Sequence, residues 1–193
     1  MRDQHSNPIQ DALVQLGTQA ETLKLPYLLI GGNAIISYGI IRLTRDIDFL
    51  IPETAVKEWR TFLENSGYQC FHATPAFCQF HSQGEPHALN LAPVDLMIVD
   101  TSTWQKLSAK AERKAITRTY SPHLPAATHL IAMKLKAWQN PHRREDAQDW
   151  NDIVKLIQKL EIDIKKPDVA ELIVSYGGNE ALIQLENALS SSP

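Results

Sequence analysis

Residues 27–52 hold the pattern that most restricts what this chain can fold into. The apolar segment YLLIGG predicts a buried strand followed by a tight turn, because it ends in two glycines. The next segment, NAIISYG, fits a short helix with Asn33 as its N-cap and Gly39 at its end. The segment DIDFLIP predicts a second strand, which Pro52 ends. Because only a short helix and a turn separate the two strands, we expect them to be neighbours in one small sheet.

Helical and strand patterns continue on both sides of these two strands. The other elements expected in the first 105 residues are helices over 9–23 and 54–66 and strands over 68–74, 77–83 and from Val94 onward. Beyond Asp100, helices are expected over 104–114, 126–139, 146–161, 167–176 and 179–189. The fold class is therefore α/β, of the α+β kind. Residues 1–105 are expected to form a core with a small mixed sheet, and residues 106–193 a helical half that closes a cleft.

Composition limits the broad class of protein. The chain has 193 residues, of which 44% are hydrophobic, so it can bury a core. No apolar run approaches the roughly 18–20 residues of a membrane span, and the N-terminal residues lack the apolar segment of a secretory signal. The two cysteines, Cys70 and Cys78, do not form a CxxC pair. We therefore expect a soluble, cytoplasmic protein. A net charge of −3 does not by itself indicate nucleic-acid binding.

Three aspartates carry the chemistry that the sequence suggests. Asp46 and Asp48 are two residues apart on one strand, so their side chains point to the same face. Asp95 begins the apolar strand VDLMIVD, where a carboxylate is costly unless it is paired or bound to metal. If the two strands are adjacent, the three carboxylates could hold two divalent ions, Mg²⁺ or Mn²⁺, about 3.5–4 Å apart. Asp95 could also accept the proton of an attacking hydroxyl.

Gly31 and Gly32 add a second feature to this unit. Glycine lets a phosphate approach the backbone closely, and the start of a helix offers free N–H groups to an anion. Simpler explanations remain for each feature taken alone. A DxD also ends or caps surface strands, Asp95 also fits a turn at a strand start, and paired glycines occur in many tight turns. Their order along one short stretch of chain favours a phosphate and metal site.

The segment IGGNAIISYGIIRLTRDIDFLI resembles the nucleotidyltransferase core of the DNA polymerase β superfamily, and more narrowly its AbiEii-like branch of abortive-infection and toxin–antitoxin proteins. Arg42, Thr44, Asp46 and Asp48 match the R-x-T-x-D-I-D strand of that branch, and VDLMIVD matches the strand of its third carboxylate. Residues 129–157 are similar to the family's lysine helix and the aspartate helix that follows it. The resemblance covers roughly residues 25–160 and assigns residues 1–105 to the catalytic core.

In the helical half, Lys134 falls on the family's lysine, and Asp149 and Asp152 fall on its two aspartates. Gln148 stands where the family usually has lysine. Lys134 lies in the apolar stretch HLIAMKLKAW, so its ammonium group either reaches solvent along its own stem or serves a site.

The resemblance implies transfer of a nucleoside monophosphate from an NTP to an acceptor hydroxyl. It implies metal binding by Asp46, Asp48 and Asp95, with Lys134 neutralising phosphate charge and Asp149 orienting Lys134 or the incoming hydroxyl. The catalytic residues that it implies are Asp46, Asp48, Asp95, Lys134 and Asp149. The nucleotide-binding residues that it implies are Gly31, Gly32, Asn33, Arg42, Thr44 and Lys134.

Three kinds of acceptor or role remain open at the level of sequence. By resemblance, the chain is the toxin of a toxin–antitoxin pair that adds nucleotides to an RNA or tRNA 3′ end and has a cognate antitoxin as partner. A second hypothesis is a small-molecule nucleotidyltransferase of the antibiotic-modifying type. A third is a non-catalytic antitoxin or regulatory module, although a protein without activity has no need to keep three clustered acids.

The remaining patterns in the sequence concern nucleic-acid binding and other catalytic or metal motifs. Lys106, Lys110, Arg113 and Lys114 recur at helical spacing, followed by Arg118 and by Arg143–Arg144. Such a basic face could receive a nucleic-acid backbone, or could simply be solvated. The seven histidines do not show the spacing of a zinc site, and neither a GxSxG nor a P-loop motif occurs.

Overall fold

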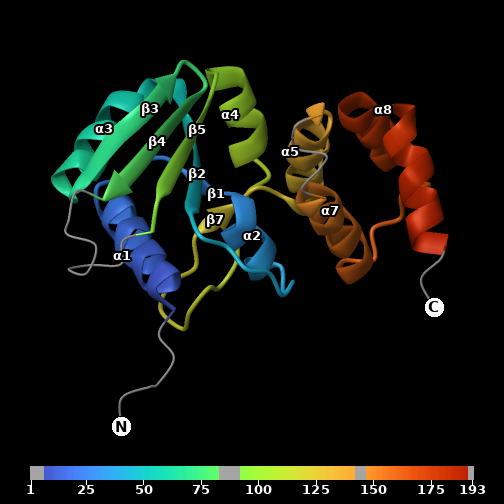
Figure 1. Ribbon diagram of the computed structural model, residues 1–193, viewed down its shortest axis with the longest axis horizontal. Coiled ribbons are helices and arrows are strands. Elements are labelled where there is room, and N and C mark those ends of the chain that lie inside the picture. The colour runs from blue at the N-terminus through green and yellow to red at the C-terminus, as the bar shows by residue number, and fades with distance from the viewer. Residues whose placement is uncertain (1–6, 83–91, 142–146, 191–193) are drawn as a thin grey trace, which may run out of the picture. The chain divides into compact units, whose positions relative to one another are not determined.

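A five-stranded sheet organises the first part of the protein in this computed structural model, which describes residues 7–82, 92–141 and 147–190. The strands lie in the order β1-β2-β5-β4-β3 (Figure 1). Their bounds are β1 Leu28–Leu29, β2 Ile47–Pro52, β3 Tyr68–Thr74, β4 Phe77–Ser82 and β5 Val94–Val99. Strands β2 and β5 are parallel, and the other neighbours are antiparallel. The predicted mixed sheet and the predicted pairing of the first two strands are therefore confirmed.

Helices join the strands of this sheet. They are α1 Pro8–Thr22, α2 Gly31–Ser37, the 3₁₀ turn η1 Glu53–Ala55, α3 Val56–Asn65 and α4 Thr101–Ser108. Helix α1 begins where Asn7 accepts a hydrogen bond from the backbone N–H of Ile9, with Pro8 at its first turn. Its apolar stripe, which includes Leu13 and Leu16, is buried. The helices expected over 9–23 and 54–66 are therefore present.

The core of the sheet unit is built around aromatic rings. Trp59 of α3, Phe49 of β2 and Tyr27, which directly precedes β1, have ring centroids 5.1–5.8 Å apart. The indole N–H of Trp59 donates to the carbonyl of Pro26 at 3.0 Å, so its single polar atom is satisfied. On β2, burial is interrupted only at Asp48, which is partly exposed on the opposite face from Phe49. This packing fixes β2 and therefore the face on which Asp48 lies.

Two local predictions were wrong. Asn33 is inside α2 rather than at its N-cap, because the helix already begins at Gly31. The basic stretch 104–114 is not one helix: α4 ends at Ser108, and Glu112–Arg113 forms strand β6, which pairs with β7 at His123–Leu124. The side chain of Arg113 donates to His123 and lies 3.3 Å from Glu21, so Arg113 is held by a local network. Arg143 and Arg144 lie outside the described residues.

The second unit is helical. It contains α5 Ala127–Trp138, α7 Gln148–Lys159 and α8 Pro167–Ser190. Helix α8 combines the two predicted C-terminal helices across a kink at Gly178, whose φ of 76° and ψ of 173° are not helical. No helix in the described parts of the chain is both long enough and apolar enough to cross a membrane.

The contacts within the chain define the two units. The sheet unit contains the residues up to Ser37 together with Ile41–Pro125, and the helical unit contains Tyr38–Ile40 together with the residues from Ala126 onward. Residues 106–125, which the sequence assigned to the helical half, group with the sheet by these contacts. One reason is Tyr120, whose buried hydroxyl lies 2.8 Å from that of Tyr27.

Candidate active site

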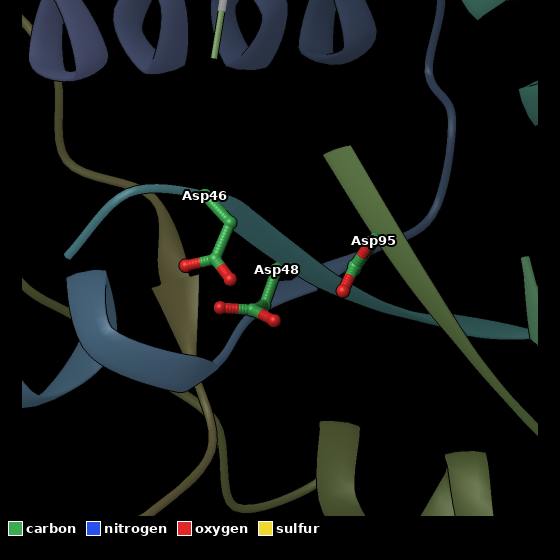
Figure 2. Close-up of side chains that lie close together, drawn as sticks. All are labelled: Asp46, Asp48 and Asp95. Atoms are coloured by element: carbon green, nitrogen blue, oxygen red, sulfur yellow. The ribbon is translucent and has the colours of Figure 1, made fainter. Parts of the chain in front are cut away.

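Asp46, Asp48 and Asp95 lie together at one end of the sheet (Figure 2). Asp48 of β2 and Asp95 of β5 are direct partners in the parallel pair, and Asp46 lies just before β2 on the same face. One carboxylate oxygen from each residue lies within 4.8 Å of the other two. The proximity that the sequence predicted for these three side chains is therefore present in the structure.

The cluster brings three like charges close together. Burial raises the pKa of Asp95 above its usual range, and the negative charge of Asp46 raises it further. The amide of Gln79 acts in the opposite direction and lowers the pKa, since its Nε2 lies 3.3 and 3.4 Å from the two carboxylate oxygens of Asp95. A divalent cation would relieve the remaining repulsion, and three carboxylates offer the oxygen ligands that Mg²⁺ or Mn²⁺ prefers.

The sequence did not reveal the contribution of Gln79. This residue lies on β4, directly opposite Asp95 of β5 in the antiparallel pair. The alternation of β4, with Cys78 and Phe80 buried, shows only that Gln79 faces away from the core. Its contact with Asp95 depends on β5 being placed between β2 and β4, which the order of strands along the chain does not indicate.

The two glycines at the start of α2 approach the carboxylates closely. Gly31 has a φ of 62°, and a Cβ atom at this position would collide with the carboxylate of Asp48. A Cβ on Gly32 would collide with the side chain of Thr44 and would crowd the guanidinium carbon of Arg42 at 3.2 Å. Four of the predicted nucleotide-binding residues, Gly31, Gly32, Arg42 and Thr44, therefore lie close together next to Asp48.

The segment before β2 is held by two side chains. Asn33 donates from Nδ2 to the backbone carbonyl of Asp46 at 2.8 Å. Thr44 donates from Oγ1 to Oδ1 of Asp46 at 3.1 Å. Both contacts fix Asp46, the one carboxylate of the three that lies outside a strand. In this structure, therefore, Asn33 and Thr44 position a carboxylate.

A second charged group is buried in the helical unit. Nζ of Lys134 on α5 lies 3.1 Å from Oδ1 of Asp149 and 2.7 Å from Oδ2 of Asp152, both on α7. The side chains of these three residues are 10%, 10% and 3% exposed. Lys134 therefore does not extend into solvent, and the apolar residues around it surround a paired charge. The sequence resemblance matched Asp152 but gave it no role, and the structure shows that it makes the shorter of the two contacts.

The structure thus gathers the predicted site residues in two groups. The sheet unit holds Gly31, Gly32, Asn33, Arg42, Thr44, Asp46, Asp48 and Asp95, and the helical unit holds Lys134 and Asp149. Among the described residues, the three aspartates are the one group of three or more potential ligands that could hold a metal. His72 and His81 of the β3–β4 hairpin do not belong to it.

The fold and this acidic cluster define a nucleotidyltransferase of the polymerase β type. The family model described as "Nucleotidyl transferase AbiEii toxin, Type IV TA system" matches residues 12–191. The chain therefore belongs to the AbiEii family of nucleotidyltransferase toxins. Comparison with curated proteins gives no match.

Solved structures of nucleotidyltransferases share this fold. The antibiotic-resistance factor ANT(2″)-Ia is 12% identical with a TM-score of 0.68, over 93% of this chain and 96% of that one. An antigenic nucleotidyltransferase-like protein from Paracoccidioides brasiliensis is 17% identical with a TM-score of 0.62, over 96% and 92%. The nucleotidyltransferase toxin MenT4 from Mycobacterium tuberculosis is 19% identical with a TM-score of 0.58, over 87% and 62%. At these identities the likeness is one of fold.

Proposed function

We propose that this protein transfers a nucleoside monophosphate from an NTP to an acceptor hydroxyl and releases pyrophosphate. The observation that carries the proposal is the cluster of Asp46, Asp48 and Asp95 on one face of a nucleotidyltransferase sheet. The three carboxylates would hold Mg²⁺ or Mn²⁺, and the spacing typical of such sites suits two ions. Bound ions would neutralise the phosphates and make the acceptor hydroxyl more acidic.

The reaction needs one bond to form and one to break. The acceptor oxygen attacks the α-phosphorus, the bond from that phosphorus to the bridging oxygen of the β-phosphate breaks, and pyrophosphate leaves with the bonding electrons. Asp95 accepts the proton of the acceptor hydroxyl, since its carboxylate lies in the cluster and burial raises its pKa above the usual range. Positioning and charge neutralisation supply most of the rate enhancement in such a reaction.

The nucleotide-binding group lies on the β1 side of the cluster. Gly31 and Gly32 pack against Asp48 and Thr44 where a side chain would not fit, so their backbone lies next to the carboxylates that would hold the metal and the phosphates. Arg42 brings a positive charge close to Gly32 and is suited to the phosphate chain of the NTP. Asn33 and Thr44 contribute by holding Asp46.

Lys134 is proposed to neutralise phosphate charge from the helical unit. Its pairing with both Asp149 and Asp152 holds the ammonium in one place, so Asp149 serves as its orienting partner. When a triphosphate is bound, its oxygens would compete with these carboxylates for the three N–H donors of Lys134.

The acceptor is proposed to be an RNA, with the 3′ end of a tRNA as the specific case, in a cytoplasmic toxin that a cognate antitoxin restrains. Membership of a toxin family and the likeness to the toxin MenT4 support this choice. The second candidate acceptor is a small molecule, which the likeness to ANT(2″)-Ia, solved in complex with adenylyl-2″-tobramycin, favours.

A labelling experiment tests the proposal. The purified chain is incubated with Mg²⁺ or Mn²⁺, total cellular RNA and each of the four α-labelled NTPs, beside the isosteric double variant Asp46→Asn/Asp48→Asn. Label that enters an RNA band with one NTP, and that the double variant does not transfer, supports an RNA nucleotidyltransferase. Label that appears only when tobramycin is the acceptor supports the small-molecule candidate. The absence of transfer to either acceptor contradicts the proposed reaction.

A further inference from the structure

The face of the sheet that carries the carboxylates continues onto β4. Cys78 and Phe80 of β4 are buried, so Gln79 and His81 point to the opposite face. Gln79 is the direct partner of Asp95, and residues that face each other across an antiparallel pair lie on the same side of the sheet. His81 is therefore on the same face as Asp48 and Asp95.

His81 is stacked against an exposed aromatic ring on the edge strand. The rings of Phe71 and His81 have centroids 5.0 Å apart and planes 13° from parallel. Phe71 is 56% exposed although it is apolar, and His81 is exposed as well. The pairing of β3 with β4 shifts by one residue between Cys70 and His72, so Phe71 is the extra residue of a bulge. A bulge changes the direction of the side chain that it carries, and here the ring of Phe71 stacks on that of His81.

This aromatic pair lies close to the carboxylates. Asp95 is opposite Gln79, and His81 follows Gln79 by two residues, so Asp95 and His81 are diagonal neighbours with Cα atoms about 7–8 Å apart. Val94 of β5 is the partner of both Ile47 on β2 and Phe80 on β4, so these three residues form one row across the sheet. Asp46 precedes Ile47 and His81 follows Phe80, so both lie at the level of the neighbouring row. The pair is thus roughly one nucleotide's length from the cluster.

The pair also lies on the side of the cluster that the nucleotide-binding group does not use. Gly31 and Gly32 begin α2, which follows β1 and contacts β2, and Arg42 lies close to Gly32. Phe71 and His81 belong to β3 and β4, which lie beyond β5 in the strand order of Figure 1. Asp95, the proposed proton acceptor of the attacking hydroxyl, stands between the two groups. An acceptor whose hydroxyl meets Asp95 therefore extends toward β4 and β3.

We propose that Phe71 and His81 form a stacking platform for the 3′-terminal base of a nucleic-acid acceptor. This inference rests on the proposed function and specifies its acceptor. An exposed aromatic ring can stack on any nucleobase, because every base has a π-face. A saturated amino sugar such as tobramycin has no ring of that kind, so the platform favours RNA over the small-molecule acceptor.

Binding measurements test the platform without requiring any transfer of a nucleotide. The probe is a short oligoadenylate with a 5′ fluorescein, either with an intact 3′-terminal base or with an abasic 3′-terminal nucleotide. Its Kd is measured by anisotropy in the presence of Mg²⁺. For the wild-type chain, removal of the terminal base is expected to raise Kd about tenfold. Phe71→Ile is expected to bind both probes equally, and Phe71→Tyr to restore the preference for the intact base.

Phe77→Ile is the matched control. Phe77 lies on the same face of β4 as His81, also two residues from Gln79, but on the side away from Asp46. It is expected to keep the wild-type preference. All four proteins are compared by thermal unfolding, so that a loss of the β3–β4 hairpin is recognised as such. In the transfer assay, Phe71→Ile is expected to raise KM for RNA about tenfold and to leave KM for the NTP unchanged.

The outcomes separate this proposal from the proposed reaction. A folded Phe71→Ile that prefers the intact base as strongly as wild type overturns the platform, and leaves the ring pair as a cross-strand contact of the hairpin. Transfer activity in a wild-type protein that does not distinguish the two probes also overturns it, while the reaction stands. A base preference that depends on Phe71 in a protein that transfers no nucleotide supports the platform and contradicts the reaction.

Discussion

Asp48 and Asp95 face each other directly across the parallel strands β2 and β5, where opposite positions usually hold apolar or complementary side chains. With Asp46 beside them, their mutual repulsion opposes folding in the absence of a cation. A divalent cation held between the three carboxylates, as proposed, would offset this repulsion. The stability of the protein is therefore expected to depend on such an ion.

Divalent ions are expected to raise the melting temperature through this cluster. A ligand present at 100 times its Kd adds about 2.7 kcal/mol to the free energy of unfolding. Asp48→Asn is expected to gain less from Mn²⁺ than wild type, because one of the three carboxylate ligands is gone. Differential scanning fluorimetry with and without Mn²⁺ measures the gain of each protein. Asp100→Asn, at an exposed N-cap, is the control that should respond to Mn²⁺ as wild type does. An equal Mn²⁺ shift in Asp48→Asn would count against the site.

Gly31→Ala is expected to damage the site and the fold together. Alanine at a φ of 62° carries a backbone strain of roughly 1–2 kcal/mol, and its Cβ would also displace Asp48. We expect a lower midpoint in urea and loss of the Mn²⁺ shift. Gly67→Ala is the matched control, since Gly67 also has a positive φ, of 87°, but its Cβ would meet no atom within 4 Å. If both variants keep the Mn²⁺ shift, the close approach of Gly31 to Asp48 does not matter for the metal.

Replacement of Lys134 by methionine is expected to destabilise the helical unit strongly. It would remove the ammonium that pairs with both Asp149 and Asp152, and breaking a buried pair in this way costs about 3–5 kcal/mol. The triple variant Lys134→Met/Asp149→Asn/Asp152→Asn should recover part of that loss, because the two carboxylate charges that Lys134 pairs with are removed as well. Urea unfolding measures the difference between the two variants. Equal stability of both would show that the charges of Asp149 and Asp152 are solvated.

The protein is expected to lose stability at alkaline pH through its buried tyrosines. Burial raises the pKa of Tyr68 and of Tyr120 to about 12, and burial together with Tyr120 and Glu21 raises the pKa of Tyr27. In the unfolded chain these groups lose their protons near pH 10. Between about pH 10 and pH 12 the folded state therefore holds more protons than the unfolded state, and the free energy of unfolding falls as pH rises.

Tyr27→Phe tests this linkage. At neutral pH it removes the 2.8 Å hydrogen bond to Tyr120, for a loss of about 1 kcal/mol. Toward pH 11 the variant should lose stability less steeply than wild type, since one raised tyrosine is gone. Urea unfolding across this pH range gives both slopes, and Tyr176→Phe at an exposed position is the control. Parallel slopes for wild type and Tyr27→Phe would contradict the contribution of Tyr27.

The sequence predicted most of the local structure around the carboxylates. Alternation placed Asp46 and Asp48 on one face, and the apolar strand after Pro93 placed Asp95 at a strand start; both follow from the two-residue period of a strand. Gln79 and Phe71 could not be found in this way. Their positions depend on which strands are neighbours and on a one-residue shift between β3 and β4, and neither leaves a periodic pattern in the chain.

Errors arose where tertiary contacts overrode local patterns. Asn33 has the residue type of an N-cap, but the glycines before it already adopt the helix, and its amide is used by Asp46 instead. Lys110 and Arg113 have helical spacing after Trp104, but Arg113 belongs to strand β6 and forms an ion pair with Glu21. In both cases the side chain contacts a residue that is distant in the sequence.

The order of the strands also determines when the acidic cluster can be completed during synthesis of the chain. Strand β5 lies between β2 and β4 in the sheet, yet it is made after both of them. A nascent chain that has emerged from the ribosome only as far as Ser82 carries Asp46 and Asp48 but lacks Asp95 and the strand that joins β2 to β4. The third carboxylate arrives together with the strand that completes the sheet. A chain that ends before β5 therefore cannot form the complete acidic cluster.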